Sequence, residues 1–274
     1  PVPDRPARPP RPQHVLHVVG TERLSPHLMR VRARGTDLSA FRESPHTDAY
    51  VKITFAKPEL GLEPPYDLAA LRETLAPGDL PVTRTYTVRA VSGDELTIDF
   101  VVHGDEGLAG PWAAAAQPGD RLVVSSPGGG YAPDPAADWH LFAGDESALP
   151  AIAASLEALT PDAVGAAFLE VQSVGEQVPL SAPPGVVVTW VYRGEALAGA
   201  TPVLAEAVAG WHPLDGRGQV FAHGEREAMK ALRDIVFSRW GLERAQVSLS
   251  GYWAYGRTED RFQAEKREPI GKIL

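Results

Sequence analysis

The stretch Thr83-Arg84-Thr85-Tyr86-Thr87-Val88-Arg89 is the segment from which the fold can be inferred. Its β-branched residues predict a strand, and strand alternation places Arg84 and Tyr86 on one face and Thr85 and Thr87 on the other. A flat, phosphorylated ligand would lie against the Tyr86 ring while Arg84 neutralises a phosphate, and Thr87 would reach the edge of the ring. The alternative is a barrel strand whose tyrosine covers the core and whose arginine lies on the surface.

Short strands surround this stretch in the first half of the chain. We expect strands at residues 15–19, 28–34, 49–55, 83–91, 95–103 and 121–124. The fourth and fifth are joined by Ser92-Gly93-Asp94, which is a hairpin signal. Together the strands predict an antiparallel β-barrel over residues 14–133. Residues 1–13 are rich in proline and arginine and cannot pack a core, so we expect them to be extended or disordered.

After Asp138 the pattern changes to alternating strands and helices. We expect strands at 139–143, 166–171, 185–192, 218–223 and 246–252, and helices at 148–159, 201–209 and 225–240. This alternation predicts a parallel sheet layered by helices over residues 138–253. The predicted fold class is therefore a β-barrel followed by an α/β domain.

The tail at residues 254–274 is polar and predicts one more helix. Thr258 is a suitable N-cap, with Glu259 and Asp260 in the first turn and Lys266 and Arg267 in the last. The simplest interpretation is a solvated helix whose charges match its dipole.

Composition excludes several classes of function. The 274 residues contain no cysteine, which rules out disulfides, thiolate catalysis and cysteine-ligated iron–sulfur clusters. Electron chemistry would therefore need a bound cofactor. The net charge of −9 argues against nucleic-acid binding, and no apolar run is long enough to cross a membrane.

Two turns resemble phosphate-binding sites. Gly110-Pro111 opens an alanine-rich helical segment, and the free N–H groups at such a helix start would suit a pyrophosphate. The turn at residues 143–150 follows a strand and precedes a helix, where a dinucleotide-binding fold places its phosphate turn. It lacks the Gly-x-Gly-x-x-Gly pattern, and Asp145 and Glu146 would oppose a pyrophosphate electrostatically.

Taken in order, these motifs resemble the siderophore-interacting protein family, flavin-dependent ferric-siderophore reductases related to the ferredoxin-NADP reductases. The resemblance runs from about His14 to about Gly256 and rests on the residues at 83–89, 98–105, 110–113, 118–120, 143–150 and 250–253. It implies FAD held between a flavin-binding barrel and an NAD(P)-binding-like domain. Its implied cofactor-binding residues are Arg84, Thr85, Tyr86, Thr87, His103, Gly104, Gly110, Pro111, Trp112, Ala113, Asp145, Ser147 and Ala148.

The resemblance also implies a cationic rim for an anionic ferric siderophore. Lys52 and Arg257 fit this role best, and Arg261 and Lys266 are weaker candidates. No catalytic acid or base is required, because electrons pass through the flavin, and no protein ligand to a metal is expected.

The function implied is reduction of Fe(III) in a siderophore, with NADH, NADPH or reduced ferredoxin as the electron donor. One alternative is a general NAD(P)H-flavin oxidoreductase with another small acceptor. Another is a flavin-free iron-chelate binding protein. We expect a monomeric, cytoplasmic protein that neither binds nucleic acid nor inserts into a membrane.

Overall fold

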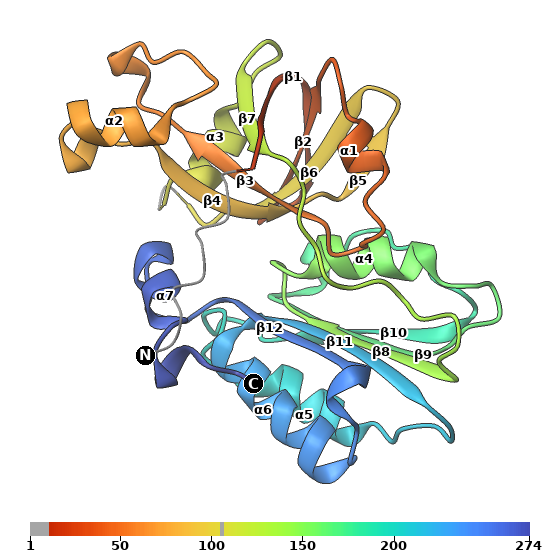
Figure 1. The fold of residues 1–274 in the computed structure, drawn as a ribbon. Helices are drawn as coiled ribbons and strands as arrows, with labels where there is room; N and C mark the ends of the chain where they lie inside the picture. The colour runs from red at the N-terminus through yellow and green to blue at the C-terminus, as the bar shows by residue number, and fades with distance from the viewer. Residues whose placement is uncertain (1–10, 105–106) are drawn as a thin grey trace, which may run out of the picture.

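The computed structural model describes residues 11–104 and 107–274 and contains two sheets (Figure 1). A seven-stranded antiparallel, barrel-like sheet is followed by a five-stranded parallel sheet, so the predicted fold class is confirmed. Most of the expected disordered segment, and Asp105 of the second motif, lie outside the described residues. Gln13 already pairs with Ser125, so regular structure begins one residue earlier than expected.

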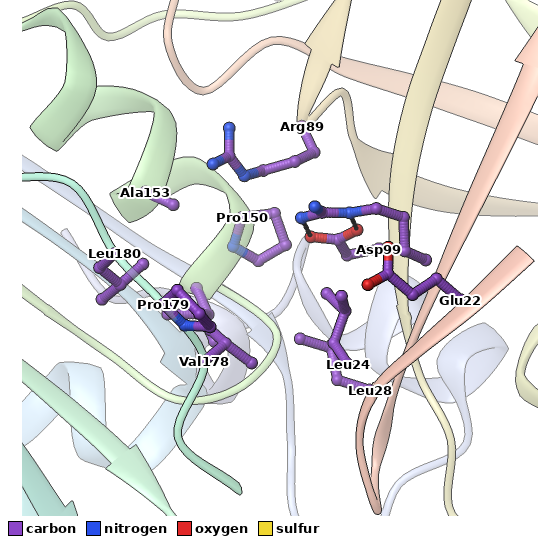
Figure 2. A pocket seen from close by; sticks show the side chains of 12 residues that line it. Glu22, Leu24, Leu28, Arg89, Asp99, Pro150, Ala153, Val178, Pro179 and Leu180 are labelled. Carbon is purple, nitrogen blue, oxygen red and sulfur yellow. Dashed lines mark hydrogen bonds and ion pairs between the residues drawn. The ribbon is translucent and has the colours of Figure 1, made fainter.

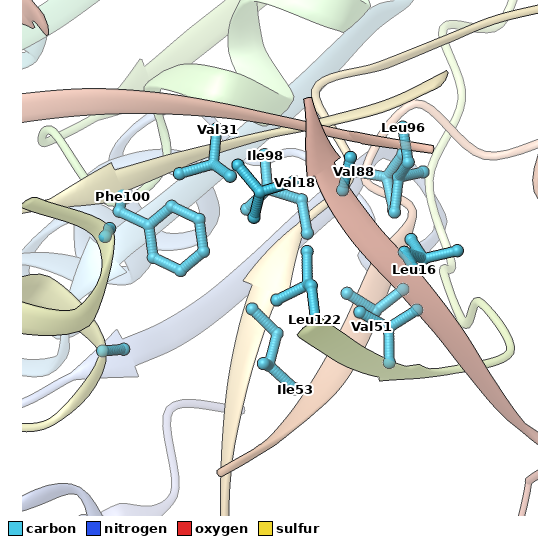
Figure 3. Close-up of a cluster of buried hydrophobic side chains, with 14 of the residues drawn as sticks. Leu16, Val18, Val31, Val51, Ile53, Val88, Leu96, Ile98, Phe100 and Leu122 are labelled. Atoms are coloured by element: carbon cyan, nitrogen blue, oxygen red, sulfur yellow. The ribbon is translucent and has the colours of Figure 1, made fainter. Parts of the chain in front are cut away.

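The barrel strands follow the order β4-β3-β7-β1-β2-β6-β5. Their bounds are β1 (Gln13–Ser25), β2 (Leu28–Arg34), β3 (Tyr50–Phe55), β4 (Val82–Thr87), β5 (Ala90–Ser92), β6 (Glu95–Val101) and β7 (Arg121–Ser125). Three short helices accompany them, α1 (Ser39–Arg42), α2 (Leu68–Thr74) and α3 (Ala109–Ala115). The core is built from the inward-facing aliphatic residues of the strands and Phe100 (Figure 3).

The predicted single strand at 83–91 is two strands, because the chain changes partners between them. β4 pairs with β3, and Val88 N–H still donates to Ala49 O at 2.7 Å. Arg89 N–H then donates to Thr97 O at 2.9 Å, and β5 pairs with β6. This change of partner brings the two ends of the sheet together. The predicted hairpin at residues 92–95 is present, with Gly93 at φ +59°.

The parallel sheet follows the order β10-β9-β8-β11-β12. Its strands are β8 (Trp139–Gly144), β9 (Val164–Val171), β10 (Gly185–Tyr192), β11 (Gly218–Glu225) and β12 (Val247–Trp253). Helix α4 (Leu149–Ala158) lies between this sheet and the barrel, whereas α5 (Val203–Gly210) and α6 (Arg226–Arg233) cover the other face (Figure 1). The strand order diverges on either side of β8, which creates a switch point between β8 and β11.

Shorter helical turns complete the chain. The predicted helix at 225–240 is α-helical to Arg233 and continues as a π-helix at Asp234–Arg239. The 3₁₀ turns lie at Pro58–Leu60, Pro77–Asp79, Val174–Glu176, Arg244–Gln246 and Pro269–Gly271. Within residues 11–104 and 107–274, no helix combines the length and apolar character needed to cross a membrane.

The barrel and the parallel sheet contact each other through apolar and polar groups. Leu28 of β2 packs in the same buried cluster as Leu149 and Ile152 of α4. Arg89 forms a two-armed ion pair with Glu157 of α4, at 2.5 and 2.9 Å. Because these contacts join segments far apart in sequence, they set the position of one sheet relative to the other.

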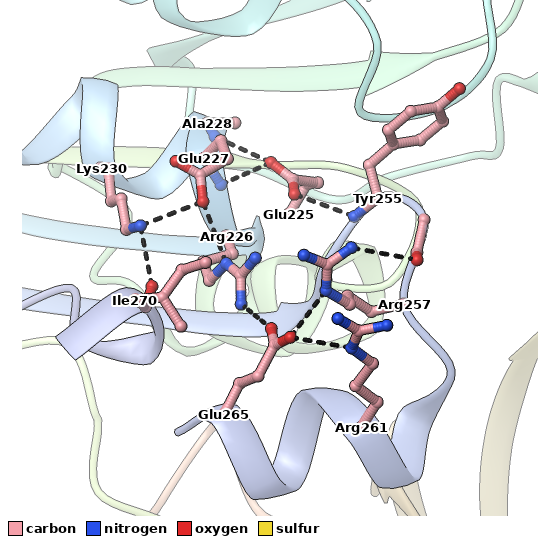
Figure 4. Close-up of polar contacts among 11 residues, drawn as sticks. Glu225, Arg226, Glu227, Ala228, Lys230, Tyr255, Arg257, Arg261, Glu265 and Ile270 are labelled. Atoms are coloured by element: carbon pink, nitrogen blue, oxygen red, sulfur yellow. Dashed lines mark hydrogen bonds and ion pairs between the residues drawn. The ribbon is translucent and has the colours of Figure 1, made fainter. Parts of the chain in front are cut away.

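The tail helix α7 (Glu259–Glu265) is docked on the protein, so the expectation of a solvated helix is wrong. Phe262 is buried, and the Glu265 carboxylate accepts hydrogen bonds from Arg226 at 2.5 Å, Arg257 at 2.7 Å and Arg261 at 3.1 Å (Figure 4). The bond from Arg226 is the main cause that holds the pKa of Glu265 at about 2. The tail therefore belongs to the folded body of the protein.

Glu265→Gln should loosen this tail, because an amide carries no charge to hold three guanidinium groups. We expect trypsin to cleave within residues 257–267 at least about tenfold faster than in the parent, since cleavage follows local opening. The folded-state pKa of Glu265, about 2, lies below its ordinary 4.5. Its stabilising contribution is therefore present above pH 4.5 and is lost as the pH falls through 2.

Glu268→Gln is the matched control, because Glu268 is an exposed tail glutamate whose side chain forms no ion pair within the described residues. Limited proteolysis at pH 7 compares the two variants. Equal cleavage rates would show that Glu265 does not hold the tail.

Candidate functional site

Four aromatic rings line the region around Tyr86 in the barrel. The Tyr86 ring lies 4.4 Å from Phe100, which lies 5.6 Å from Trp112, and Trp112 lies 5.7 Å from Phe55, all between ring centroids. Tyr86 is partly buried, and burial raises its pKa, so the phenol stays neutral. It covers part of the core, as the alternative interpretation holds, and it is one of the partly buried rings of this aromatic cluster.

Arg84 meets the tail helix rather than open solvent. Its Nη1 donates to Thr83 O at 2.9 Å and to Asp260 Oδ1 at 3.2 Å. The side chain of Asp260 is 79% exposed, whereas that of Arg84 is 21% exposed. Asp260 is therefore a solvent-facing anion that a ligand phosphate can replace. Thr85 is exposed and Thr87 is buried, although strand alternation places both on the same face.

The predicted pyrophosphate turn packs tightly against the end of β6. Helix α3 begins at Ala109, and its N-cap Leu108 supplies no side-chain cap. A Cβ at Gly110 would lie 3.2 Å from Val101 O, so glycine permits the close approach. Pro111 and Trp112 follow in the helix, and Ala113 is fully buried beneath them.

His103 and Gly104 lie in the turn after β6. Gly104 has φ +52°, the left-handed region that favours glycine. The His103 ring lies 6.3 Å from the His27 ring, and His27 Nδ1 is 2.6 Å from Glu176 Oε1 of the parallel-sheet domain. The turn thus lies near a contact between the two sheets.

The Asp145 carboxylate is held by donors from the protein itself. Oδ1 accepts from the backbone N–H and the hydroxyl of Ser147, and Oδ2 accepts from Glu225 N–H at 2.8 Å and Trp253 Nε1 at 2.9 Å. Ala148 is fully buried behind it. Asp145 therefore joins the ends of β8, β11 and β12, and a contact with a dinucleotide stays a prediction for this residue and for Ser147 and Ala148.

A buried charge cluster lies beside this turn. Arg193 Nη2 is 2.6 Å from Glu146, and its Nη1 is 3.8 Å from Glu170. Burial is the main cause that raises the pKa of Glu146 and brings that of Glu170 to about 7. Sequence reasoning missed Glu170 and Arg193, although Glu170 is the only charged residue in the apolar strand β9 and could have been noticed for that reason.

The predicted cationic rim is rearranged by the tail. Lys52 is exposed on β3, where it is the cross-strand partner of Thr85. Desolvation lowers the pKa of Lys266; the charge of Glu259 opposes this shift, and the charge of Lys52 adds to it. Arg257 and Arg261 instead bind Glu265. The Glu265 carboxylate thus holds both arginines, whereas neither Lys52 nor Lys266 forms an ion pair within the described part of the chain.

A separate cavity of about 180 Å³ lies between the barrel and α4 (Figure 2). Leu24 and Leu28 form part of its apolar lining, opposite Pro150 and Leu180, and the Arg30–Asp99 ion pair forms its polar wall. None of the residues predicted to bind a cofactor or substrate lines it. In the part of the chain that the structure describes, no group of three or more His, Asp or Glu is arranged to hold a metal ion.

Family models match both parts of the chain. Residues 17–131 match the siderophore-interacting FAD-binding domain, and residues 137–256 match the siderophore-interacting protein model. The chain belongs to the siderophore-interacting protein family. Its barrel is an FAD-binding domain, which confirms the predicted cofactor.

Relatives of this siderophore-interacting protein support the assignment over nearly the full chain. An uncharacterized protein of Mycobacterium tuberculosis is 46% identical over 93% of this chain and 95% of its own length. The ferric vibriobactin reductase ViuB of Vibrio cholerae is 36% identical over 92% of this chain and 93% of its own. The crystal structure of a siderophore utilization protein from T. fusca aligns with a TM-score of 0.77 and 37% identity, covering 91% and 95% of the two chains.

The residues present fit FAD. The partly buried Tyr86 ring can pack against a flat ligand ring, and the guanidinium of Arg84 has only an exposed carboxylate, Asp260, as its charged partner. Gly110 lets the start of α3 approach the end of β6 without a side chain in the way. The barrel therefore offers a cation to the anionic phosphates of a flavin nucleotide and an aromatic side chain to its flat ring system.

Glu170→Gln should change how stability depends on pH. The folded-state pKa of Glu170, about 7, lies above its ordinary 4.5, so its stabilising contribution is full below pH 4.5 and is lost as the pH rises through 7. Glutamine resembles the protonated form. We expect the variant and the parent to have the same free energy of unfolding at pH 5. At pH 9 the free energy of unfolding of the variant should be higher by about 1–3 kcal/mol, as measured by urea unfolding.

Glu206→Gln, at an exposed position of α5, is the control. Its free energy of unfolding should equal that of the parent at both pH values. If the free energy of unfolding depends on pH in the same way in the parent and in Glu170→Gln, the raised pKa of Glu170 is contradicted.

Proposed function

We propose that this protein is an FAD-dependent reductase of ferric siderophores. Electrons from NADH, NADPH or reduced ferredoxin pass through FAD to Fe(III), and Fe(II) is released for iron assimilation. The observation that carries the proposal is the match of residues 17–131 to the siderophore-interacting FAD-binding domain. Lys52 is the cross-strand partner of Thr85, so this cation lies on the strand face of Thr85 and Thr87, opposite the face of Arg84 and Tyr86. The reductase name of ViuB supports the same activity.

In this proposal each residue has a binding or positioning task. Arg84 neutralises a phosphate of FAD, Tyr86 supports the ring, and Thr87 lies at the reactive edge. FAD supplies the ability to take up two electrons and to give them up singly, which suits ferric iron. Lys52 and Lys266 attract the anionic chelate, and iron stays coordinated by the siderophore rather than by the protein.

The wider assignments are part of the same proposal. Residues 14–133 bind FAD, residues 138–253 receive the electron donor, and residues 254–274 complete the substrate rim. The protein acts as a cytoplasmic monomer. Of the two other functions considered, the flavin-free binding protein is disfavoured by the match to an FAD-binding domain.

The deciding experiment is anaerobic photoreduction of the bound flavin followed by mixing with ferric chelates. We expect flavin absorbance to recover and a ferrous indicator to report Fe(II) with ferric siderophores. Recovery with quinones or ferricyanide but with no ferric siderophore would favour the general oxidoreductase. A purified protein that does not bind added FAD would favour the binding protein.

Arg84→Ala should weaken FAD binding, because it removes a charge-assisted hydrogen bond to phosphate. The expected loss is about 1.5–3 kcal/mol, or roughly ten- to a hundredfold in Kd. Asp260→Asn should act in the opposite direction by removing the anion that competes for Arg84, with a gain of up to about fivefold. Flavin fluorescence titration of the apoprotein measures both.

Arg72→Ala, on the exposed face of α2, is the control and should leave the Kd unchanged. An unchanged Kd in Arg84→Ala would place that arginine outside the FAD site.

Lys52→Ala and Lys266→Ala should each weaken binding of an anionic ferric chelate by about 0.2–1 kcal/mol, and the double variant should lose more. Binding should also weaken with salt, because exposed charges are screened over about 8–10 Å. As the pH approaches the pKa of Lys266, which is lowered from 10.5, the parent should lose affinity. Chelate titrations at several salt concentrations and pH values measure these effects.

Lys272→Ala, an exposed lysine near the end of the tail, is the control for removing one charge. Identical salt slopes for the parent and the double variant would remove support for a lysine rim.

A further inference from the structure

The cavity between the barrel and α4 is lined by both domains (Figure 2). Leu24 and Leu28 belong to its barrel wall, and Leu149 of α4 and Leu180 of the segment at 178–180 belong to the opposite wall. Leu28 and Leu149 lie in one buried hydrophobic cluster, and the other two leucines pack against it. A molecule in this cavity would therefore contact both domains at once.

The size of the cavity limits the apolar part of a ligand. Its volume is about 180 Å³. An apolar cavity of about 150 Å³ is large enough to bind benzene. Ala153 of α4 is buried and contributes only a methyl group to the lining, so the helix leaves this space open. One aromatic ring with a short chain matches the space available.

The two arginines that line the cavity are already neutralised by carboxylates. Arg30 donates from Nε to Asp99 Oδ1 at 2.7 Å and from Nη2 to Asp99 Oδ2 at 2.8 Å. Arg89 donates from both terminal nitrogens to the Glu157 carboxylate, at 2.9 and 2.5 Å. Two-armed pairs of this kind are among the stronger charge-assisted hydrogen bonds. A ligand anion would have to break one of these pairs to reach a guanidinium.

Glu22 is the charged lining residue that forms no ion pair within residues 11–104 and 107–274. It lies on β1 as the cross-strand partner of Arg30, and its side chain is exposed. Figure 2 shows its carboxylate directed from the barrel strand toward the cavity. Because the carboxylate is exposed, a ligand cation can contact it while remaining in water, which avoids the cost of burying a charge. The cavity thus combines an apolar interior with a negative charge at its rim.

We propose that this cavity binds a small arylalkyl amine. The ring lies between the barrel wall and α4, and the ammonium group contacts the Glu22 carboxylate. None of the residues assigned to FAD or to the siderophore lines the cavity, so this is a separate site and the inference does not rest on the proposed function. Because the ligand contacts both domains, its binding stabilises the contact between them.

The test compares three probes on the FAD-loaded full chain by isothermal titration calorimetry. The probes are 2-phenylethylamine, 2-phenylethanol and 3-phenylpropionate, which share a phenylethyl group and carry a positive charge, no charge and a negative charge. We expect the amine to bind about two- to fivefold more tightly than the alcohol, as for an exposed ion pair. The carboxylate should bind more weakly than the alcohol, because Glu22 repels it.

Glu22→Gln keeps the size of the side chain and removes its charge. In this variant the Kd of the amine should rise to that of the alcohol, whereas the Kd of the alcohol should stay unchanged. Glu43→Gln is the matched control, because Glu43 is an exposed barrel glutamate that does not line the cavity. It should bind all three probes as the parent does.

Ala153→Leu tests the location of the site independently of charge. The larger side chain fills the space beside α4, so all three probes should lose at least about tenfold in affinity as their rings are excluded. FAD affinity and circular dichroism should match the parent in every variant, which shows that the proteins are folded. If Ala153→Leu does not fold, the comparison of Glu22→Gln with Glu43→Gln still decides the proposal.

The absence of saturable amine binding would overturn the proposal, as would equal amine affinity in the parent and Glu22→Gln. Tighter binding of 3-phenylpropionate than of the amine would also overturn it, because the arginines would then be the recognition groups. Unchanged binding in a folded Ala153→Leu would place the amine elsewhere. No electron transfer is measured, so each result is distinct from failure of the proposed function.

Discussion

The contact between the barrel and the parallel-sheet domain is the constraint on which the site depends. Its most specific element is the buried carboxylate of Glu176, which accepts hydrogen bonds from Ser25 Oγ at 2.6 Å and from the backbone N–H of His27 at 3.2 Å. Burial alone would raise the pKa of Glu176, but the bonds from Ser25 and His27 keep it below its ordinary value. A charged group satisfied only by the opposite domain opposes separation of the two.

Because the two domains are held together, residues of the barrel, the parallel sheet and the tail can contribute to one region. The barrel supplies an aromatic cluster and a guanidinium, while the parallel sheet supplies Tyr252 at a bulge of β12. The tail adds Asp260 beside Arg84, and its Glu265 holds Arg257 and Arg261. The chain is acidic overall, with a net charge of −9, so its cations can attract an anion only through their local position and not through an overall positive charge.

Local patterns predicted those features whose causes are local. Alternation along the strand at 82–87 and the Ser92-Gly93-Asp94 turn both follow from neighbouring residues, and both are present. The break after Thr87 was not predictable in the same way, because Val88 remains a good strand residue and only the change from β3 to β6 interrupts the pairing. The π-helix after Arg233 likewise lies within a stretch whose apolar spacing is helical.

The sequence by itself determined the order of a barrel and a parallel sheet, the strand that carries Arg84 and Tyr86, and a capped helix in the tail, because periodicity and turn chemistry act over a few residues. Only the tertiary structure decided which of the tail's basic side chains are held in ion pairs with the protein's own carboxylates. Arg257 and Arg261 are bound by Glu265, which also binds Arg226. It also decided that Glu176 meets Ser25 and His27, since residues far apart in the sequence approach only when burial of two cores brings their elements together.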